Sequence, residues 1–116
     1  MFADLPRDGC VAVIFTSLRA MTDGVLVDDD GYARTAALMA ELAAEQPGYL
    51  GVESARGVDG LGITVSYWAS EDDAVAWRTV AEHTTAREAG RGRWYQRYEL
   101  RVATVQRSYG WERDLS

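Results

Sequence analysis

Residues 61 to 78 read LGITVSYWASEDDAVAWR, and this stretch decides the fold. Its first eight residues alternate between large apolar side chains and small or polar ones, which is typical of a β-strand with two different faces. Ser70 then suits a helix N-cap, and the three acids after it suit the positive end of a helix dipole. Apolar side chains recur at helical spacing further on, at Ala74, Trp77, Val80 and Ala81. The stretch therefore predicts a strand followed directly by a helix.

Similar signals extend in both directions from this stretch. Pro47-Gly48 is a strong helix terminator, and residues 57–60 form a short hairpin connection. The predicted elements are a strand over 11–18, a helix over about 30–45, strands over 49–56 and 61–68, a helix from Ser70 to Gly90 and Gly92, and a last strand within 94–109 that is clearest over 100–105. The order β-α-β-β-α-β predicts an α+β, ferredoxin-like fold, in which a four-stranded antiparallel sheet carries both helices on one face.

Length, composition and charge limit the classes of function. The chain has 116 residues, of which 47% are hydrophobic, so we expect a single domain over 1–116 with its core at about 11–109. The net charge of −6 argues against nucleic acid and membrane partners. All 12 basic residues are arginine, which excludes lysine Schiff-base chemistry. Cys10 is the single cysteine, and no apolar run is long enough for a membrane span, so we expect a cytoplasmic protein.

The second face of the predicted sheet has no helix to cover it. We expect this face to carry aliphatic and aromatic residues as well as polar ones. An exposed apolar face on a small domain usually marks an interface, and a two-fold dimer is the commonest way to cover one. The sequence therefore predicts a homodimer.

Three segments resemble the antibiotic biosynthesis monooxygenase family. They are PGYLGVES (47–54), GITVSYWASEDDAVAWR (62–78) and EHTTAREAGRGRWYQRYELRVATVQRSY (82–109), and the likeness extends over about 11–109. The resemblance implies the dimeric α+β barrel fold. Some named members are monooxygenases that convert polyketide phenols into quinones without metal or flavin, and others bind and degrade haem. The resemblance thus implies a small aromatic substrate and O2 as partners, with no cofactor and no metal.

Two polar residues of the second helix are the candidate catalytic groups. His83 is the single histidine and the predicted general base or proton relay, with a helix-surface histidine as the alternative. Arg87 is the predicted stabiliser of a phenolate or enolate oxygen, with a structural salt bridge as the alternative. In the haem-degrading relatives an iron-binding histidine follows a helix tryptophan at a fixed spacing. The position at the same spacing after Trp77 is occupied by Arg87 in this chain. Arginine cannot ligate iron, which counts against haem.

Aromatic side chains are the candidate walls of a substrate pocket. Flat rings suit a flat polycyclic ligand, but they equally suit a protein core or a dimer interface. The predicted substrate-binding residues are Tyr67, Trp68, Trp77, Tyr95 and Tyr98. Because Tyr67 and Trp68 are successive strand residues, they should point to opposite faces of the sheet.

Three functions are compatible with these residues. The first is a cofactor-independent monooxygenase that acts on an aromatic or phenolic, polyketide-like molecule. The second is a dimeric barrel protein that binds a small ligand in the same pocket without turnover. Haem binding is the third, and the arginine at the expected ligand position disfavours it.

Overall fold

The structure of the protein is a computed structural model that describes residues 2–6, 8–87 and 90–114. Its elements are β1 (Cys10–Arg19), β2 (Met21–Thr22), β3 (Val25–Leu26), α1 (Asp29–Ala44), β4 (Tyr49–Arg56), β5 (Leu61–Trp68), α2 (Glu71–Arg87), α3 (Gly90–Trp94) and β6 (Tyr95–Val105). The long strands and helices confirm the predicted order. The sequence missed the short hairpin β2–β3 and the helix α3, which begins at the glycine where the preceding helix was expected to end.

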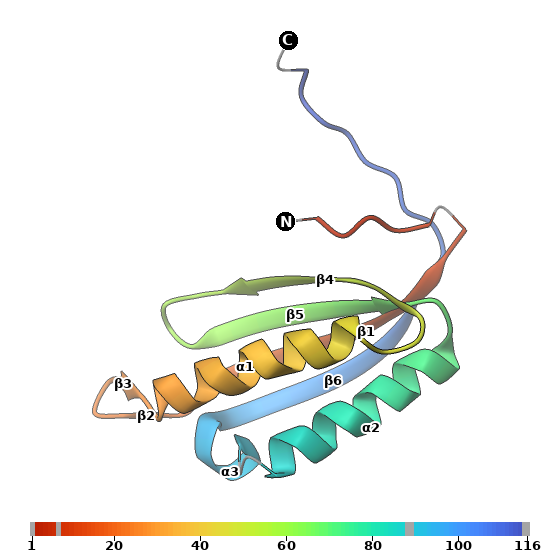
Figure 1. The fold of residues 1–116 in the computed structure, drawn as a ribbon. Helices are drawn as coiled ribbons and strands as arrows, with labels where there is room; N and C mark the ends of the chain where they lie inside the picture. The colour runs from red at the N-terminus through yellow and green to blue at the C-terminus, as the bar shows by residue number, and fades with distance from the viewer. Residues whose placement is uncertain (1, 7, 88–89, 115–116) are drawn as a thin grey trace.

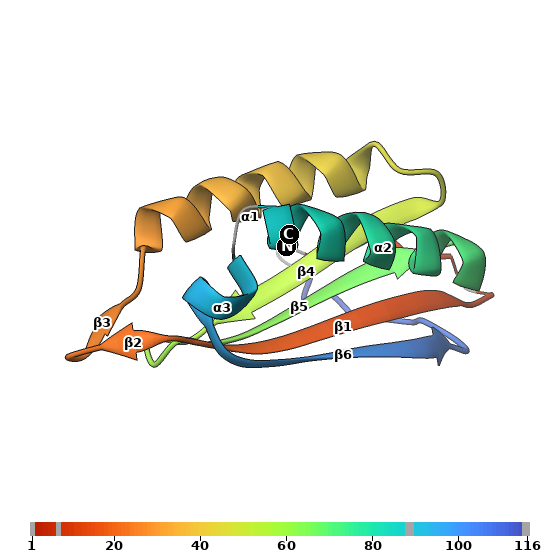
Figure 2. The same ribbon diagram turned by 90° about the horizontal axis from the view of Figure 1, so that it is seen from below.

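The four long strands form one antiparallel sheet in the order β4-β5-β1-β6. Non-sequential neighbours in this order are the mark of the ferredoxin-like arrangement, so the predicted fold is confirmed. Both long helices, α1 and α2, lie on the same side of the sheet, and the other side carries no helix (Figures 1 and 2). We call the helix-covered side the cavity face and the opposite side the far face.

Strand β5 shows how differently the two faces are populated. Thr64 and Ser66 lie under the helices, so the small or polar series of the strand belongs to the cavity face. The large apolar series belongs to the far face, where the side chains of Leu61 and Ile63 are 46% and 45% exposed. Leu18 of β1 pairs with Leu61 on the same face and is 37% exposed. The bulky aliphatic side chains of this strand therefore lie on the side that no helix covers.

The packed core occupies one end of the space between helices and sheet. Trp68 is fully buried, and its ring stacks on that of Trp77 with centroids 5.7 Å apart. Its indole Nε1 donates a hydrogen bond to Ser66 Oγ at 2.9 Å, so the buried N–H is satisfied. Val13, Ala43 and Ala74 complete this cluster. Because the hydrophobic core is confined to the β5–α2 connection, it does not fill the rest of the space between the helices and the sheet.

The chain beyond β6 leaves the body of the domain and runs past the β4 edge (Figure 1). In this C-terminal arm, residues 106–114, the side chains of Tyr109 and Trp111 are 93% and 81% exposed. Within the described part of the chain, no helix has the length and hydropathy that crossing a membrane requires.

Candidate active site

A cavity of about 300 Å³ lies between α1, α2 and the cavity face of the sheet. This volume is at the lower end of the range of small-molecule sites, which span roughly 300–1,000 Å³. Its sides include Ala36, Met39 and Ala40 from α1 and Trp77 and Ala81 from α2, and its floor includes Val52, Ser54, Thr64 and Ser66. Alanines on the helices and small residues on the floor leave this volume unfilled, because the elements are spaced by the larger side chains at the ends.

One end of the cavity is formed by an aromatic cluster of four rings, Phe15, Tyr32, Tyr95 and Tyr98. Phe15 lies 5.6 Å from the Tyr95 ring and 5.3 Å from the Tyr98 ring, and the two tyrosine rings are 5.4 Å apart. Most of these contacts are edge-to-face, the geometry that ring quadrupoles favour. The cluster therefore presents both ring edges and phenol groups to a ligand.

The phenol of Tyr95 is held in its protonated form. Burial raises its pKa above the ordinary value, and a hydrogen bond with Tyr32 raises it further. The positive charges of Arg56 and Arg19 act in the opposite direction, and burial prevails. At neutral pH Tyr95 is thus a neutral phenol in a largely apolar site, hydrogen-bonded to Tyr32.

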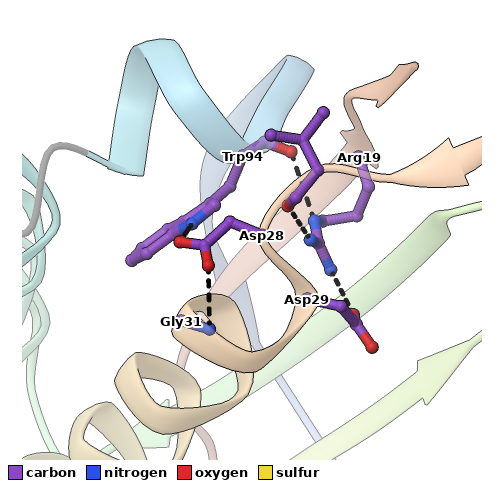
Figure 3. A network of polar contacts seen from close by, with 6 residues as sticks. Arg19, Asp28, Asp29, Gly31 and Trp94 are labelled. Atoms are coloured by element: carbon purple, nitrogen blue, oxygen red, sulfur yellow. Dashed lines mark hydrogen bonds and ion pairs between the residues drawn. The ribbon is translucent and has the colours of Figure 1, made fainter.

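Two arginines lie against the ring of Tyr32. The guanidinium carbon of Arg19 is 3.7 Å from the ring centroid and that of Arg56 is 4.8 Å from it, both within cation–π range. Arg19 is 2% exposed and fully engaged, because its guanidinium donates to Trp94 O (3.2 Å), Val27 O (2.9 Å) and Asp29 Oδ1 (3.3 Å). Figure 3 shows this arginine between the start of α1 and the end of α3. Arg19 is a structural cation that fixes the wall behind Tyr32.

Asp28 ties the same wall together from the other side of α1 (Figure 3). It caps the helix by accepting from Gly31 N at 3.3 Å, and it also accepts from Trp94 Nε1 at 3.0 Å. Arg93 forms an ion pair with the same carboxylate at 3.3 Å. The hydrogen bond from Trp94, more than any other cause, lowers the pKa of Asp28. The start of α1, and with it Tyr32, is therefore anchored to α3.

Three of the five predicted substrate-binding residues line the cavity, namely Trp77, Tyr95 and Tyr98. Trp68 points to the same side of the sheet but is buried beside Trp77, away from the cavity surface. Tyr67 points to the far face, where its hydroxyl donates to Glu53 Oε1 at 2.6 Å. The expectation that Tyr67 and Trp68 face opposite ways is confirmed, and neither of them lines the cavity.

The two predicted catalytic residues are exposed on α2 and do not line the cavity. Trp77, Ala81 and Thr85 face inward at successive turns of this helix. His83 is two residues from Ala81, about 200° around the helix axis, and therefore points outward. Arg87 is likewise exposed, and it makes contacts of its own. The group on α2 that lines the cavity and can take a proton is Glu82.

The cavity residues that sequence reasoning missed include Phe15, Tyr32, Arg56 and Glu82. Tyr32 recurs at helical spacing with the apolar residues of the first helix, and Phe15 alternates with Val11 and Val13 along the first strand, so both positions carried a signal. Arg56 was only the last residue of a predicted strand. The sequence does place Arg56 on the same strand face as Val52 and Ser54, because alternate residues of a strand point the same way, and this is the face that meets the helices.

The family model described as antibiotic biosynthesis monooxygenase matches residues 28–89, more than half of the chain. The chain belongs to the antibiotic biosynthesis monooxygenase family. The matched segment runs from the cap of α1 through the α2 residues that line the cavity, so it includes both helical walls of the site.

One curated relative and two solved structures are similar to this chain. The chain is 50% identical over 102 residues to the uncharacterised protein YqjZ of Bacillus subtilis (strain 168), covering 88% of this chain and 84% of that protein. The crystal structure of PA3566 from Pseudomonas aeruginosa matches with a TM-score of 0.63 at 12% identity, over 90% of this chain and 99% of that one. SnoaB, a cofactor-independent oxygenase from Streptomyces nogalater, matches with a TM-score of 0.61 at 16% identity, over 87% of this chain and 96% of that one. At these identities the two structures show a shared fold.

Proposed function

We propose that the protein is a cofactor-independent monooxygenase that oxidises an aromatic small molecule bound between α1, α2 and the sheet. The observation that carries this proposal is the cavity itself, whose aromatic cluster and Trp77 form flat walls around a small-residue floor. Family membership supports the reaction class, and the similarity of the fold to SnoaB, whose name describes a cofactor-independent oxygenase, is consistent with it.

The reaction needs no resident redox group if the substrate itself supplies the electrons. An electron-rich phenolic substrate that has lost a proton transfers an electron to O2, and a carbon–oxygen bond then forms between the two. For an anthrone-type substrate the balance is anthrone plus O2 giving quinone plus water. The ring methylene loses one hydrogen as a proton to a base, and this proton returns to the bound dioxygen to give a hydroperoxide on the ring carbon. The O–O bond then breaks as the second hydrogen leaves together with the outer oxygen as water. The protein contributes a largely apolar site bordered by the hydrogen-bonded phenols of Tyr32 and Tyr95.

The base in this reaction is a second part of the proposal. Glu82 lines the cavity, whereas His83, the residue predicted from the sequence, points away from it. We assign proton removal to Glu82, because a general base must reach the proton that it abstracts directly or through one water molecule.

Oxygen uptake with a panel of anthrone-type phenols tests both parts. We expect the wild-type protein to accelerate uptake with at least one substrate, Glu82→Gln to lower that rate by about 100-fold, and His83→Ala to retain it. If the wild-type rate equals the buffer rate for every substrate, the monooxygenase proposal fails. If His83→Ala is the slow variant, the assignment of the base is wrong and the role predicted from the sequence is restored.

Ligand binding without turnover is the second candidate function. The observation that favours it is the placement of the predicted catalytic pair, His83 and Arg87, outside the cavity. It predicts that an aromatic ligand raises the melting temperature while no oxygen is consumed. Haem binding has less support, because the single histidine of the chain does not line the cavity.

We further propose that the far face is covered by a second copy of the chain. Leu18, Leu61 and Ile63 leave aliphatic surface open there. On the adjacent strand β6, Glu99 forms ion pairs with both Arg97 at 3.0 Å and Arg101 at 2.9 Å, which partly neutralises the two arginines. This pairing reduces the repulsion between like charges that two copies would meet across a two-fold axis. The exposed Tyr109 and Trp111 of the C-terminal arm offer further contact surface for that copy.

A further inference from the structure

Arg56 differs from the other arginine at the aromatic end of the cavity. Arg19 is buried, forms an ion pair with Asp29 and donates hydrogen bonds to two carbonyl groups, so its guanidinium already has partners within the protein. Arg56 lines the cavity and is exposed, and within residues 2–6, 8–87 and 90–114 no carboxylate forms an ion pair with it. Its polar donors therefore remain available for a ligand.

Strand β5 has a glycine at the position that lets Arg56 lie over the sheet. Arg56 pairs with Gly62 across the two strands. A Cβ atom at position 62 would lie 3.3 Å from Arg56 Nη1 and 3.4 Å from its Cζ, closer than most real Cβ contacts. A glycine inside a strand often marks such a close approach. The missing side chain thus allows the guanidinium to turn inward, toward the ring of Tyr32, instead of outward into solvent.

The groups around this guanidinium favour a negatively charged oxygen. Tyr95, a neutral phenol at neutral pH, lies at the same end and is close enough for the charge of Arg56 to affect it. Tyr32 lies between Arg56 and Arg19. The cavity also has a cation and an anion on α2, Arg78 and Glu82. One free guanidinium and two phenols at the aromatic end make a site for an anion beside a flat apolar surface.

We propose that the aromatic end of the cavity binds the anionic oxygen of a planar aromatic ligand, a phenolate or a carboxylate, through the guanidinium of Arg56, beside the hydrogen-bonded phenols of Tyr32 and Tyr95. Gly62 is a positioning residue in this site, because it leaves the space in which Arg56 lies. The inference rests on the proposed function only in using the same cavity. In the monooxygenase it means that the guanidinium stabilises the anion that forms when Glu82 removes a proton from the bound substrate.

A matched pair of ligands that do not consume oxygen separates binding from turnover. Isothermal titration at pH 7 compares anthraquinone-2-carboxylate with anthraquinone-2-carboxamide, which has nearly the same shape and no charge. We expect the wild-type protein to bind the carboxylate at least tenfold more tightly. Arg56→Met should abolish this preference, Arg56→Lys should keep part of it, and Tyr95→Phe and Gly62→Ala should each weaken it several-fold. Arg78→Met, which removes the other cavity-lining cation, is the control and should keep it.

The outcomes distinguish this inference from the proposed function. If both ligands bind the wild-type protein equally, or if Arg78→Met and not Arg56→Met removes the preference, the anion site is wrong and the cavity remains the site. If neither ligand binds at millimolar concentration, the cavity is not a site for aromatic ligands, and the proposed function fails together with the inference. Unchanged melting temperatures of the Arg56 variants would show that lost binding does not reflect lost folding.

Discussion

The two faces of the sheet divide the apolar residues in an unexpected way. On strand β5 the cavity face, which two helices cover, carries Gly62, Thr64 and Ser66 before the buried Trp68 at its end, whereas the open far face carries the large aliphatic residues. A sheet that served only to fold would place its bulk under the helices, where burial contributes most. Here part of the space under the helices is a cavity, and the large aliphatic side chains of β5 lie on the far face, where only another molecule can bury them. This division is what the proposed ligand site on one face and the proposed self-association on the other face require.

The largest expected effect concerns the packed end of the cavity face. Trp77 stacks on Trp68 and borders the cavity, so Trp77→Ala should lower the free energy of unfolding by about 3–5 kcal/mol. Val58→Ala removes a fully exposed apolar side chain from the connection between β4 and β5 and should change it by no more than about 0.5 kcal/mol. Urea unfolding followed by circular dichroism measures both values. Similar losses for the two variants would contradict the placement of the core.

The second expected effect concerns the far face. Ile63→Glu would put one carboxylate from each copy into the proposed interface, and it should weaken self-association by about 100-fold or more because buried unpaired charge is costly. Val75→Glu makes the equivalent change on the helix layer, where the valine is 40% exposed, and serves as the control. Analytical ultracentrifugation over a concentration series reports both. A wild-type chain that stays monomeric at 100 µM would overturn the association proposal.

A third change compares the two faces with one substitution. Thr64→Leu adds bulk to the cavity floor and should weaken binding of an aromatic ligand by about tenfold, since the added volume takes the place of the ligand. Thr16→Leu makes the same change on the far face, at the residue paired with Ile63, and should leave binding unaltered. Titration calorimetry with anthraquinone-2-carboxylate measures the difference. Equal losses would mean that the cavity is not where the ligand binds.

The smallest expected effect is the pH dependence of the Tyr67–Glu53 pair on the far face. Burial, followed by the hydrogen bond to Glu53, raises the pKa of Tyr67 from 10.0 to about 12. The folded state therefore retains this proton longer than the unfolded state, so its contribution to stability is present below pH 10 and is lost as the pH rises through about 12. Tyr67→Phe should flatten the alkaline limb of a plot of unfolding free energy against pH.

The acid limb of the same plot tests the contribution of Glu53, the hydrogen-bond partner of Tyr67. The hydrogen bond from Tyr67 is the main reason that the pKa of Glu53 is lowered. Its contribution is present above about pH 4.3, the ordinary carboxyl pKa, and is lost as the pH falls through the lower folded value. Glu53→Gln should reduce the loss of stability in acid. A variant with the wild-type acid limb would show that this hydrogen bond does not contribute.

Local sequence patterns predicted the fold because the long elements are specified locally. Alternation over residues 61–68 and the Ser70 cap specify a strand and a helix without help from the rest of the chain. The helix α3 and the hairpin β2–β3 were missed because tertiary contacts hold them, such as the hydrogen bond from Ala20 N to Trp94 O at 2.7 Å. Short elements of this kind have no local sequence pattern strong enough to distinguish them from a turn or a loop.

The candidate site was only partly predictable from the sequence. Trp77, Tyr95 and Tyr98 line the cavity as expected, because large aromatic residues on inward positions reach any space between helix and sheet. The choice between Glu82 and His83 depended on the rotation of α2, and its mixed polar and apolar sequence does not define one clean inward stripe. The importance of Arg56 depended on which face of the sheet the helices cover, which is a property of the whole fold.

The buried guanidinium of Arg19 has a consequence for how a ligand reaches the cavity. It joins the last residue of β1 to the turn before α1 and to the carbonyl of Trp94 before β6, so that end cannot widen without breaking three hydrogen bonds at once. The floor residues on the edge strand β4 are exposed instead, with Val52 38% accessible to solvent. In the proposed reaction, substrate and product would therefore enter and leave along the β4 margin, and the guanidinium proposed to hold the ligand would be the first charge that an arriving molecule meets.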